Sequence, residues 1–168
     1  EENSKLKWGK NNIFSPKIDK AKKPFSIFLV PPNASGPLHI GNALMVAIQD
    51  ILARYHRARG NPTLWLPCTD HGGYETQVSF ERELEKTGKN KSDYTEKELF
   101  LEIKRFVENN NNTIKNQLKS LGASVDWSRF RFTMDEHSLR SVNEIFRRMV
   151  KVQLIYRSLY MVNYCPSC

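Results

Sequence analysis

Residues suited to phosphate binding gather in one stretch, Pro31-Pro32-Asn33-Ala34-Ser35-Gly36-Pro37-Leu38-His39-Ile40-Gly41-Asn42. It follows an apolar run over 25–30 and opens a segment with helical periodicity. A strand, a tight loop and a helix N-terminus in this order form a nucleotide-phosphate site, because the first N–H groups and the dipole of the helix face the ligand. His39 and Asn42 add neutral, directional hydrogen-bond donors to the first helical turn.

The glycines of this stretch exclude two common nucleotide motifs. Gly36 and Gly41 have the spacing of a P-loop, but Asn42 and Ala43 stand where that motif needs a lysine and a Ser or Thr hydroxyl. The G-x-G-x-x-G dinucleotide fingerprint is absent as well. The alternative interpretation is an ordinary loop between a strand and a helix, with an incidental histidine.

Two further segments carry residues that bind ligands or metals. An Asp-His pair and two glycines occur in the segment 68–73, which is typical of a functional loop. Asp70 has the alternative role of capping the helix that follows. Cys165 and Cys168 form a C-x-x-C pair, which supplies at most half of a tetrahedral zinc site and is otherwise two free thiols.

The hydrophobic pattern predicts the elements that position these segments. The runs 25–30 and 63–66 are short and apolar, and the first fits a buried parallel strand. Between them, apolar residues recur with the helical period from Ile40 to Arg59, and Gly60 ends that helix. A strand, a helix and a strand form a βαβ unit, which predicts an α/β fold with a parallel sheet and with ligands at the carboxyl ends of its strands.

Helical patterns continue along the rest of the chain. We predict helices over 75–86 and 95–121, the second weakened at the asparagine run 109–112. A third helix, with Thr133 or Asp135 as its N-cap, follows.

The predicted organisation has three parts. Residues 1–24 form an irregular lead-in whose apolar anchors, Trp8 and Phe14 among them, dock on the main body. Residues 25–164 form the α/β domain and end in a strand over 159–164, and residues 165–168 begin a further, truncated segment.

Composition favours a globular protein of the cytoplasm. The chain has 168 residues, of which 39% are hydrophobic, enough for one domain core. Lys and Arg number 26 against 18 Asp and Glu, a balance that suits a polyanionic partner. No apolar run reaches the roughly 20 residues of a membrane span, the lysine-rich beginning lacks a signal-peptide core, and three cysteines make no disulfide framework.

Four groups of motifs, in order, resemble the class I aminoacyl-tRNA synthetases, and most of all the valyl-tRNA synthetase family. Pro31-Pro32-Asn33 with Leu38-His39-Ile40-Gly41-Asn42 is similar to the stretch around the His-Ile-Gly-His signature of that class. The other groups are Thr69-Asp70-His71-Gly72 with Thr76-Gln77, then Asp126-Trp127 with Phe132-Thr133-Met134-Asp135, and finally Cys165-Pro166-Ser167-Cys168. Relatives for isoleucine and leucine usually have Gly-Trp-Asp in place of Cys68-Thr69-Asp70, so this segment favours valine.

The chain departs from the family pattern at several positions. Asn42 replaces the second histidine of the signature, and Val30 replaces the first of three prolines. The usual Ala-Gly-Ile-Ala-Thr-Gln is Gly-Gly-Tyr-Glu-Thr-Gln over 72–77, so Glu75 stands where alanine is expected. Phe130 replaces the glutamate of Asp-Trp-x-Arg-Glu.

The resemblance implies a Rossmann-like parallel sheet with flanking helices, the first half of a catalytic domain. It implies that valine is activated with ATP and Mg²⁺ to valyl-adenylate and transferred to tRNA(Val). ATP-binding residues are then Gly36, His39, Gly41 and Asn42, with His39 and Asn42 as the catalytic residues that stabilise charge on the phosphates. The residues that bind the amino acid are Pro31, Pro32, Asn33 and Asp70, and the Asp70 carboxylate faces the ammonium. In the whole protein, residues 165–168 would begin a zinc-knuckle or editing insertion, in which Cys165 and Cys168 are candidate Zn²⁺ ligands.

Other functions remain open at this point. The Lys-Met-Ser-Lys-Ser signature that completes the ATP site of this class does not occur in the 168 residues, so we expect this chain to be an inactive fragment. We also expect the protein to be a monomer. The alternatives are an isoleucyl- or leucyl-tRNA synthetase, a non-catalytic basic RNA-binding module, and a nucleotidyltransferase that shares the H-x-G-H loop.

Overall fold

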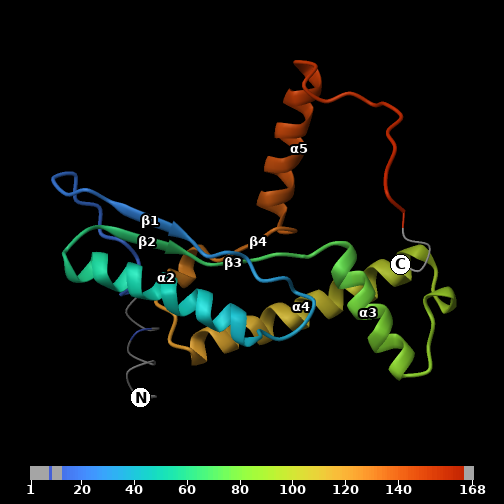
Figure 1. Ribbon diagram of the computed structural model, residues 1–168, viewed down its shortest axis with the longest axis horizontal. Helices are drawn as coiled ribbons and strands as arrows, with labels where there is room; N and C mark the ends of the chain where they lie inside the picture. The colour runs from blue at the N-terminus through green and yellow to red at the C-terminus, as the bar shows by residue number, and fades with distance from the viewer. Residues whose placement is uncertain (1–7, 9–12, 165–168) are drawn as a thin grey trace. The chain divides into compact units, whose positions relative to one another are not determined.

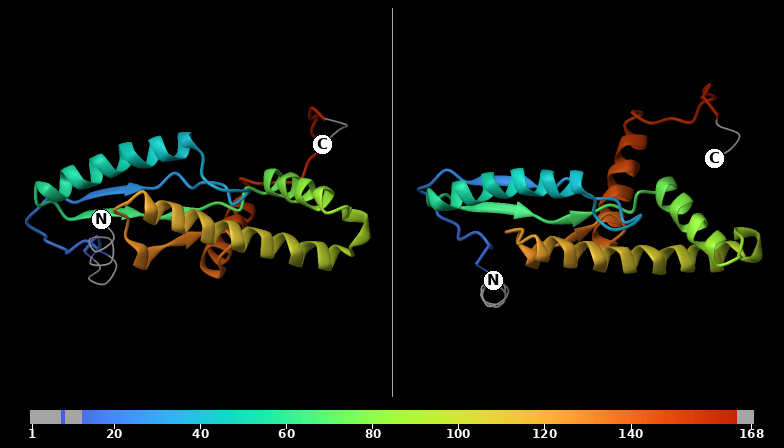
Figure 2. Two further views of the ribbon diagram at one scale, coloured as in Figure 1. Left: turned by 90° about the horizontal axis from the view of Figure 1, so that it is seen from below. Right: turned by 60° about the horizontal axis from the view of Figure 1, so that its bottom comes forward.

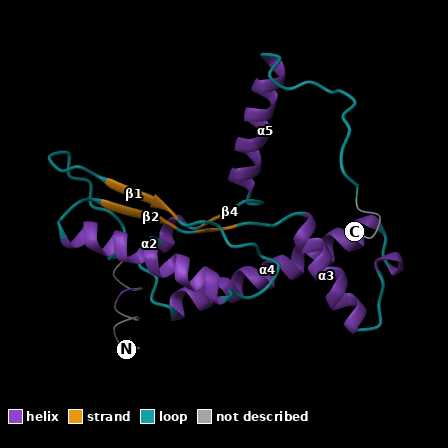
Figure 3. Ribbon diagram, in the orientation of Figure 1, coloured by secondary structure: helices purple, strands orange, loops and turns teal. Residues whose placement is uncertain are grey.

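The computed structural model describes Trp8 and residues 13–164 (Figure 1). It divides into two compact units, the first ending at Met134 and the second beginning at Asp135. Helices, strands and loops are distinguished in Figure 3. The first unit contains β1 (Phe25–Phe28), α2 (Ile40–Ala58), β2 (Thr63–Leu66), β3 (Cys68–Thr69), α3 (Tyr74–Lys86), α4 (Glu96–Ser120) and β4 (Arg131–Phe132); the second contains α5 (Glu136–Lys151).

The predicted βαβ unit and the parallel sheet are confirmed. Strands β1 and β2 pair in parallel, with Phe25 opposite Thr63. After Pro67 the chain continues into β3, which pairs in parallel with β4. The Asp126 N–H donates to the Trp65 carbonyl at 2.9 Å, so the segment that precedes β4 in the sequence lies beside β2.

The strands lie between two layers of helix. Figure 2 shows α2 on one side of β1 and β2 and the C-terminal half of α4 on the other. Trp65 of β2 is completely buried at the centre of this arrangement. The buried cluster around it consists of Leu29, Val46, Ala53, Cys68, Ile114, Leu118, Ala123 and Val125.

The apolar stripe of α2 is only partly used by this core. Val46 and Ala53 are its buried residues, whereas a row along another side of the helix is exposed. A helix that is apolar on more than one side is typical of a position inside a larger domain. The prediction of a buried first strand is wrong for the same region, because Phe28 is 53% exposed. The exposed row is Ile40, Leu44, Ile48, Ile51, Leu52 and Tyr55.

Helix α4 is continuous through its asparagine run, which the sequence predicts as a weak point. The Asn110 amide donates to the Ala34 carbonyl at 3.0 Å, and Asn111 is buried. About two turns after Asn110, Gln117 Oε1 accepts from the Leu38 N–H at 2.8 Å. Asn110 of the asparagine run and Gln117 further along α4 therefore hold the loop between β1 and α2.

Two of the predicted anchors of the lead-in, Trp8 and Phe14, pack against α2. Trp8 and Phe14 are in edge-to-face contact with ring centroids 5.7 Å apart. The guanidinium of Arg54 lies over Trp8 and that of Arg57 lies over Phe14, at 5.5 and 5.2 Å from the ring centroids. These cation–π contacts attach the lead-in to the last turns of α2.

The second unit contains α5 and an extended segment. Asp135 is the N-cap of α5 and accepts from the Ser138 N–H at 2.7 Å. The strand predicted over 159–164 is wrong: the segment pairs with no strand among the described residues, and Leu159 is fully exposed. A strand requires a neighbour for its backbone hydrogen bonds, and composition alone does not supply one. No described helix is long and apolar enough to span a membrane.

Candidate functional site

The start of α2 is a capping box built from the two predicted catalytic residues. His39 is the N-cap, and its Nδ1 accepts from the Gly41 N–H at 3.1 Å. In return, Asn42 Oδ1 accepts from the His39 N–H at 3.1 Å. The box satisfies two backbone donors that a helix start otherwise leaves unpaired.

This cap fixes the hydrogen-bonding character of both side chains. Because Nδ1 of His39 accepts, the proton of the neutral ring is on Nε2. In the capping box, Asn42 uses only its Oδ1, as an acceptor. Its two amide N–H groups take no part in the box. Both residues thus retain donors of the type that phosphate oxygens require.

Gly41 allows the His39 ring to take this position. A Cβ on Gly41 would lie 2.9 Å from Cε1 and 3.0 Å from Nδ1 of the His39 imidazole. Atoms of a real side chain do not approach so closely, so any other residue at 41 moves the ring. Gly36 differs, since nothing lies within 4 Å of a Cβ built there.

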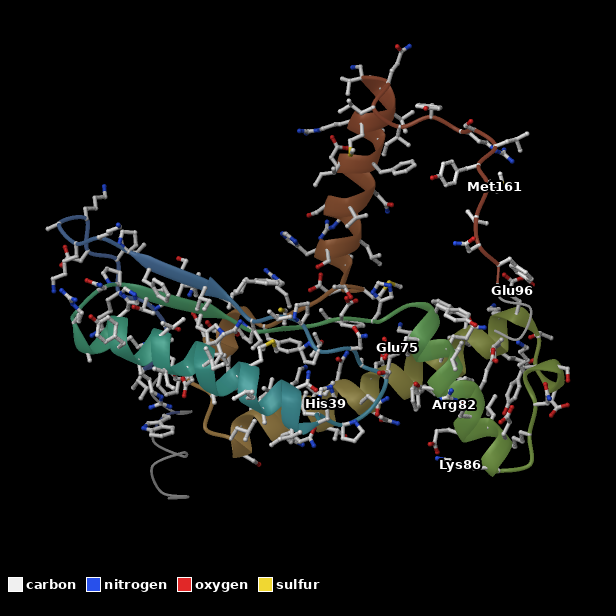
Figure 4. The ribbon with its side chains drawn as sticks, in the orientation of Figure 1. His39, Glu75, Arg82, Lys86, Glu96 and Met161 are labelled. Carbon is white, nitrogen blue, oxygen red and sulfur yellow. The ribbon has the colours of Figure 1, made fainter. Side chains whose placement is uncertain are left out.

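A cavity of about 270 Å³ opens beside the helix start. Of the residues predicted to bind ATP or amino acid, six line it, whereas Gly41 and Asp70 do not. Figure 4 labels His39, at the start of α2, and Glu75, at the start of α3, both of which line the cavity. Its lining residues are Pro31, Pro32, Asn33, Ser35, Gly36, Pro37, Leu38, His39, Asn42 and Glu75.

Asp70 is attached to the wall of this cavity through its backbone. The Asp70 N–H donates to the Pro32 carbonyl at 2.9 Å, and the Ala34 N–H donates to the Asp70 carbonyl at 2.8 Å. These two bonds form an isolated parallel bridge between Asn33 and Asp70. The residue that follows β3 and the loop that leads to His39 are therefore paired through their backbones.

The carboxylate of Asp70 is held by three partners. Its Oδ1 accepts from the Gly72 N–H at 3.2 Å and from the Thr133 hydroxyl at 3.1 Å, and it lies 3.2 Å from His71 Nδ1. The alternative role of Asp70 as a helix cap is wrong, because Gly73 is the N-cap of α3 and no side chain caps that helix start.

Two residues of the site escape prediction from the sequence as site residues. Thr133 looks like a helix N-cap, but Asp135 has that role and Thr133 bonds to Asp70 and His71 instead. Glu75 lies in the first turn of α3, and its Oε2 accepts from Asn33 Nδ2 at 2.6 Å. The signal for Glu75 was its departure from the alanine of the family pattern.

The neighbouring Cys68 thiol is unsuited to chemistry. Its Sγ donates to the Leu29 carbonyl at 2.9 Å in the core. Burial, with the nearby Asp70 charge, raises the pKa of Cys68 to about 12, so the thiol stays protonated at neutral pH.

Asp126 is a structural carboxylate. It is 1% exposed and accepts hydrogen bonds from Ser15, Ser128 and Arg129. Burial acts to raise the pKa of Asp126, but these hydrogen bonds and the Arg129 charge outweigh it and bring the pKa below its usual value.

A second cavity, of about 340 Å³, lies at the opposite ends of β1 and β2. Arg57 lines it, but its guanidinium already donates to the Ser124 carbonyl and hydroxyl. Ligands of parallel α/β sheets bind at the carboxyl ends of strands, which is where the cavity beside His39 lies.

The candidate zinc ligands Cys165 and Cys168 lie outside the described residues. Within the described part of the chain, no group of three or more His, Cys, Asp or Glu side chains is placed to hold a metal ion.

Comparisons with known proteins identify the fold and the family of this chain. A solved LeuRS of Agrobacterium radiobacter K84, in a ternary complex with tRNA and LeuAMS, has the same fold: the TM-score is 0.75 at 24% identity, over 94% of this chain and 18% of that one. The valine–tRNA ligase of Desulfotalea psychrophila is 46% identical over 168 residues, which are 100% of this chain and 19% of the relative.

Two further relatives give the same result. The valine–tRNA ligase of Thermus thermophilus is 47% identical over 96% of this chain and 19% of its own length. The chloroplastic/mitochondrial valine–tRNA ligase 2 of Arabidopsis thaliana is 44% identical over 95% of this chain and 16% of its own. The chain thus spans less than a fifth of these relatives. The sequence profile of one family, the class I tRNA synthetases (I, L, M and V), matches residues 4–168, and the chain belongs to that family.

Proposed function

We propose that this chain is part of the catalytic domain of a valine–tRNA ligase, which activates valine with ATP and transfers it to tRNA(Val). The observation that carries the proposal is the backbone bridge between Asn33 and Asp70. It joins the carboxylate suited to an ammonium group to the loop that ends in the His39 cap. An amino acid and a nucleotide phosphate bound there would be neighbours.

In the activation step, a valine carboxylate oxygen attacks the α-phosphorus of ATP. The bond from that phosphorus to the bridging oxygen breaks, and pyrophosphate leaves with the electron pair. Nε2–H of His39 and the Asn42 amide donate to phosphate oxygens as their charge develops, and the start of α2 adds its dipole. A tRNA hydroxyl then displaces AMP from the adenylate and forms the aminoacyl ester.

Asp70 and Asn33 bind the valine ammonium at the edge of the cavity, beside the backbone of Pro31 and Pro32. Asp70 does not line the cavity itself, but its backbone is bridged to Asn33, which does. Taking an ammonium group out of water needs a compensating anion, and Asp70 supplies one. The hydrogen bonds from Gly72 and Thr133 keep the Asp70 carboxylate in one orientation. Gly36 leaves room for ATP to approach the loop closely.

Oxygen donors along the cavity suit Mg²⁺, which arrives with the triphosphate and needs few protein ligands. When bound with ATP, the ion would supply positive charge to the pyrophosphate group. Cys165 and Cys168 would contribute two of four ligands to a structural Zn²⁺ in the whole protein. A monomer in the cytoplasm stays our prediction, although one relative carries an organellar name.

Amino-acid-dependent pyrophosphate exchange by the native polypeptide that carries this chain tests the proposal. Exchange should be fastest with valine and should be lost in His39→Ala and Asp70→Ala. Exchange that is fastest with isoleucine or leucine would assign another member of the family. Salt-sensitive tRNA binding without exchange, unchanged by both substitutions, would favour the RNA-binding module.

A further inference from the structure

Glu75 is a carboxylate among neutral neighbours in the candidate site. It lies in the first turn of α3 and lines the cavity beside His39, where the other described lining residues are Pro, Asn, Ser, Gly, Leu and His. The family pattern has alanine at this position. An acidic side chain here would oppose the triphosphate of ATP, so its presence requires a reason.

The contact of Glu75 with Asn33 gives that reason. Asn33 Nδ2 donates to Glu75 Oε2 at 2.6 Å. A carboxylate only accepts hydrogen bonds, so it binds the NH₂ side of the Asn33 amide and excludes the flipped orientation. The amide oxygen of Asn33 therefore remains as the acceptor on its other side.

The surroundings of Asn33 restrict its amide further. Its backbone is bridged to Asp70, and the turn at Gly72 lies against its side chain. A Cβ on Gly72 would approach Cβ and Cγ of Asn33 to 3.3 Å. The Gly72 turn packed against Cβ and Cγ and the Glu75 carboxylate at Nδ2 together favour the orientation in which the Asn33 NH₂ group faces Glu75.

We propose that Glu75 is a positioning residue for the amino-acid substrate: it holds the Asn33 amide, whose backbone is bridged to Asp70, so that the amide oxygen accepts from a free α-ammonium group. This rests on the proposed function and goes beyond it, because it assigns an acceptor role to Asn33 and a task to a residue outside the family pattern. The ligand is an α-amino acid with an unmodified ammonium. N-acetylvaline, which lacks that charge and two of its donors, should not bind.

Loss of the Glu75 side chain should weaken the binding of valine and leave the rate of the chemical step unchanged. An interaction with the ammonium is equal in the ground state and in the transition state, so its loss raises the KM for valine and leaves kcat unchanged. Loss of one oriented hydrogen bond to a charged group corresponds to about a tenfold increase in KM.

The experiment uses the native polypeptide that carries this chain and measures pyrophosphate exchange with valine and ATP varied separately. Glu75→Ala should raise the KM for valine about tenfold. Glu75→Gln should raise it less, because its amide oxygen can still accept from Asn33 Nδ2, although its NH₂ group no longer excludes the flipped Asn33 amide. Glu83→Ala is the matched control on the same helix, since Glu83 is exposed and pairs with Lys86. It should change neither constant.

A double-mutant cycle tests whether Glu75 affects valine binding through Asn33. If Glu75 acts by holding that amide, Asn33→Ala with Glu75→Ala should bind valine no more weakly than Asn33→Ala alone. The proposal would be overturned if the two substitutions raised the KM for valine by independent factors that multiply in the double variant. Equal effects of Glu75→Gln and Glu75→Ala on valine would also overturn it, because they would mean that charge alone matters.

Two other outcomes distinguish a failure of the role of Glu75 from a failure of the proposed function. A change in the KM for ATP or in the Mg²⁺ requirement, with the KM for valine unchanged, would make Glu75 a nucleotide-side residue and would overturn the inference alone. If the wild-type polypeptide shows no valine-dependent exchange while it is folded by circular dichroism, the proposed function fails first.

Discussion

The Thr133 hydroxyl lies 3.1 Å from Asp70 Oδ1 and accepts from the His71 N–H at 2.9 Å. It thereby ties the segment after β4 to the end of β3. A hydroxyl has one proton, so when that proton goes to Asp70 the contact with His71 Nδ1 at 2.7 Å is a hydrogen bond from the ring N–H. One side chain thus orients both the carboxylate and the imidazole.

Replacing Thr133 by valine, which keeps the shape and removes the hydroxyl, should weaken amino-acid binding. The Asp70 carboxylate loses a donor, so we expect the KM for valine to rise about tenfold and the free energy of unfolding to fall by about 1 kcal/mol. Pyrophosphate exchange and urea denaturation measure the two effects. Thr133→Ser retains the hydroxyl and should restore both; a valine variant with wild-type KM would contradict a role for Thr133 in the site.

Gly41 and Gly36 should respond differently to alanine. In Gly41→Ala the new Cβ displaces the His39 ring, breaks the cap and weakens ATP binding by about tenfold, an effect comparable with the loss of an N-cap. In Gly36→Ala the Cβ meets open space in the unliganded protein, so stability should stay unchanged. Titration calorimetry with ATP and thermal unfolding of both variants check this.

The Gly36 variant also tests where the nucleotide lies. If ATP approaches the loop closely, Gly36→Ala lowers ATP affinity without lowering the unfolding temperature. Unchanged affinity in Gly36→Ala would place the nucleotide away from this loop, and unchanged affinity in Gly41→Ala would contradict the assignment of His39 to the phosphates.

Cys68 should resist thiol reagents while the protein is folded. Its pKa of about 12 leaves well under 1% thiolate at pH 8, and the side chain is buried. In a variant with Cys165→Ser and Cys168→Ser, Cys68 is the one remaining cysteine of the three. Ellman's reagent should react with it on unfolding in guanidinium and hardly at all before; rapid reaction of the native protein would show that the core around β3 opens.

Stability should depend on pH through Asp126. Since the folded-state pKa of this carboxylate is lowered, its contribution is complete above the unfolded-state pKa near 3.9 and is lost as the pH falls through the folded-state value. We expect Asp126→Asn to cost about 2 kcal/mol at pH 7 and less as the pH approaches 3.

Urea unfolding followed by tryptophan fluorescence measures this difference, because Trp8, Trp65 and Trp127 all belong to the first unit. Asp19→Asn is the control: Asp19 is exposed and its oxygen is 3.9 Å from Lys22 Nζ. The control should show no such pH dependence. A constant difference between wild type and Asp126→Asn from pH 7 to pH 3 would exclude the ionised carboxylate as the cause.

The exposure of the apolar row on α2 could not be predicted from the sequence. The period of Ile40, Leu44 and Ile48 predicts a helix, and the helix is there, but these side chains are exposed in this chain. Periodicity reports that a face is apolar and not what covers it. The relatives are more than five times as long as this chain, so most of a relative's domain contacts lie outside these 168 residues.

Local rules determined much of this protein. The strand, loop and helix around His39, the parallel βαβ unit and the cap at Asp135 could be predicted, because each depends on neighbouring residues and on their backbone preferences. Motif order was sufficient for the family. Tertiary structure alone decided the contact of Asp70 with Thr133, the use of Asn110 and Gln117 to hold the loop, and the contact of Glu75 with Asn33. Those pairs are 42 to 79 residues apart in sequence, and no periodicity encodes a hydrogen bond over such a separation.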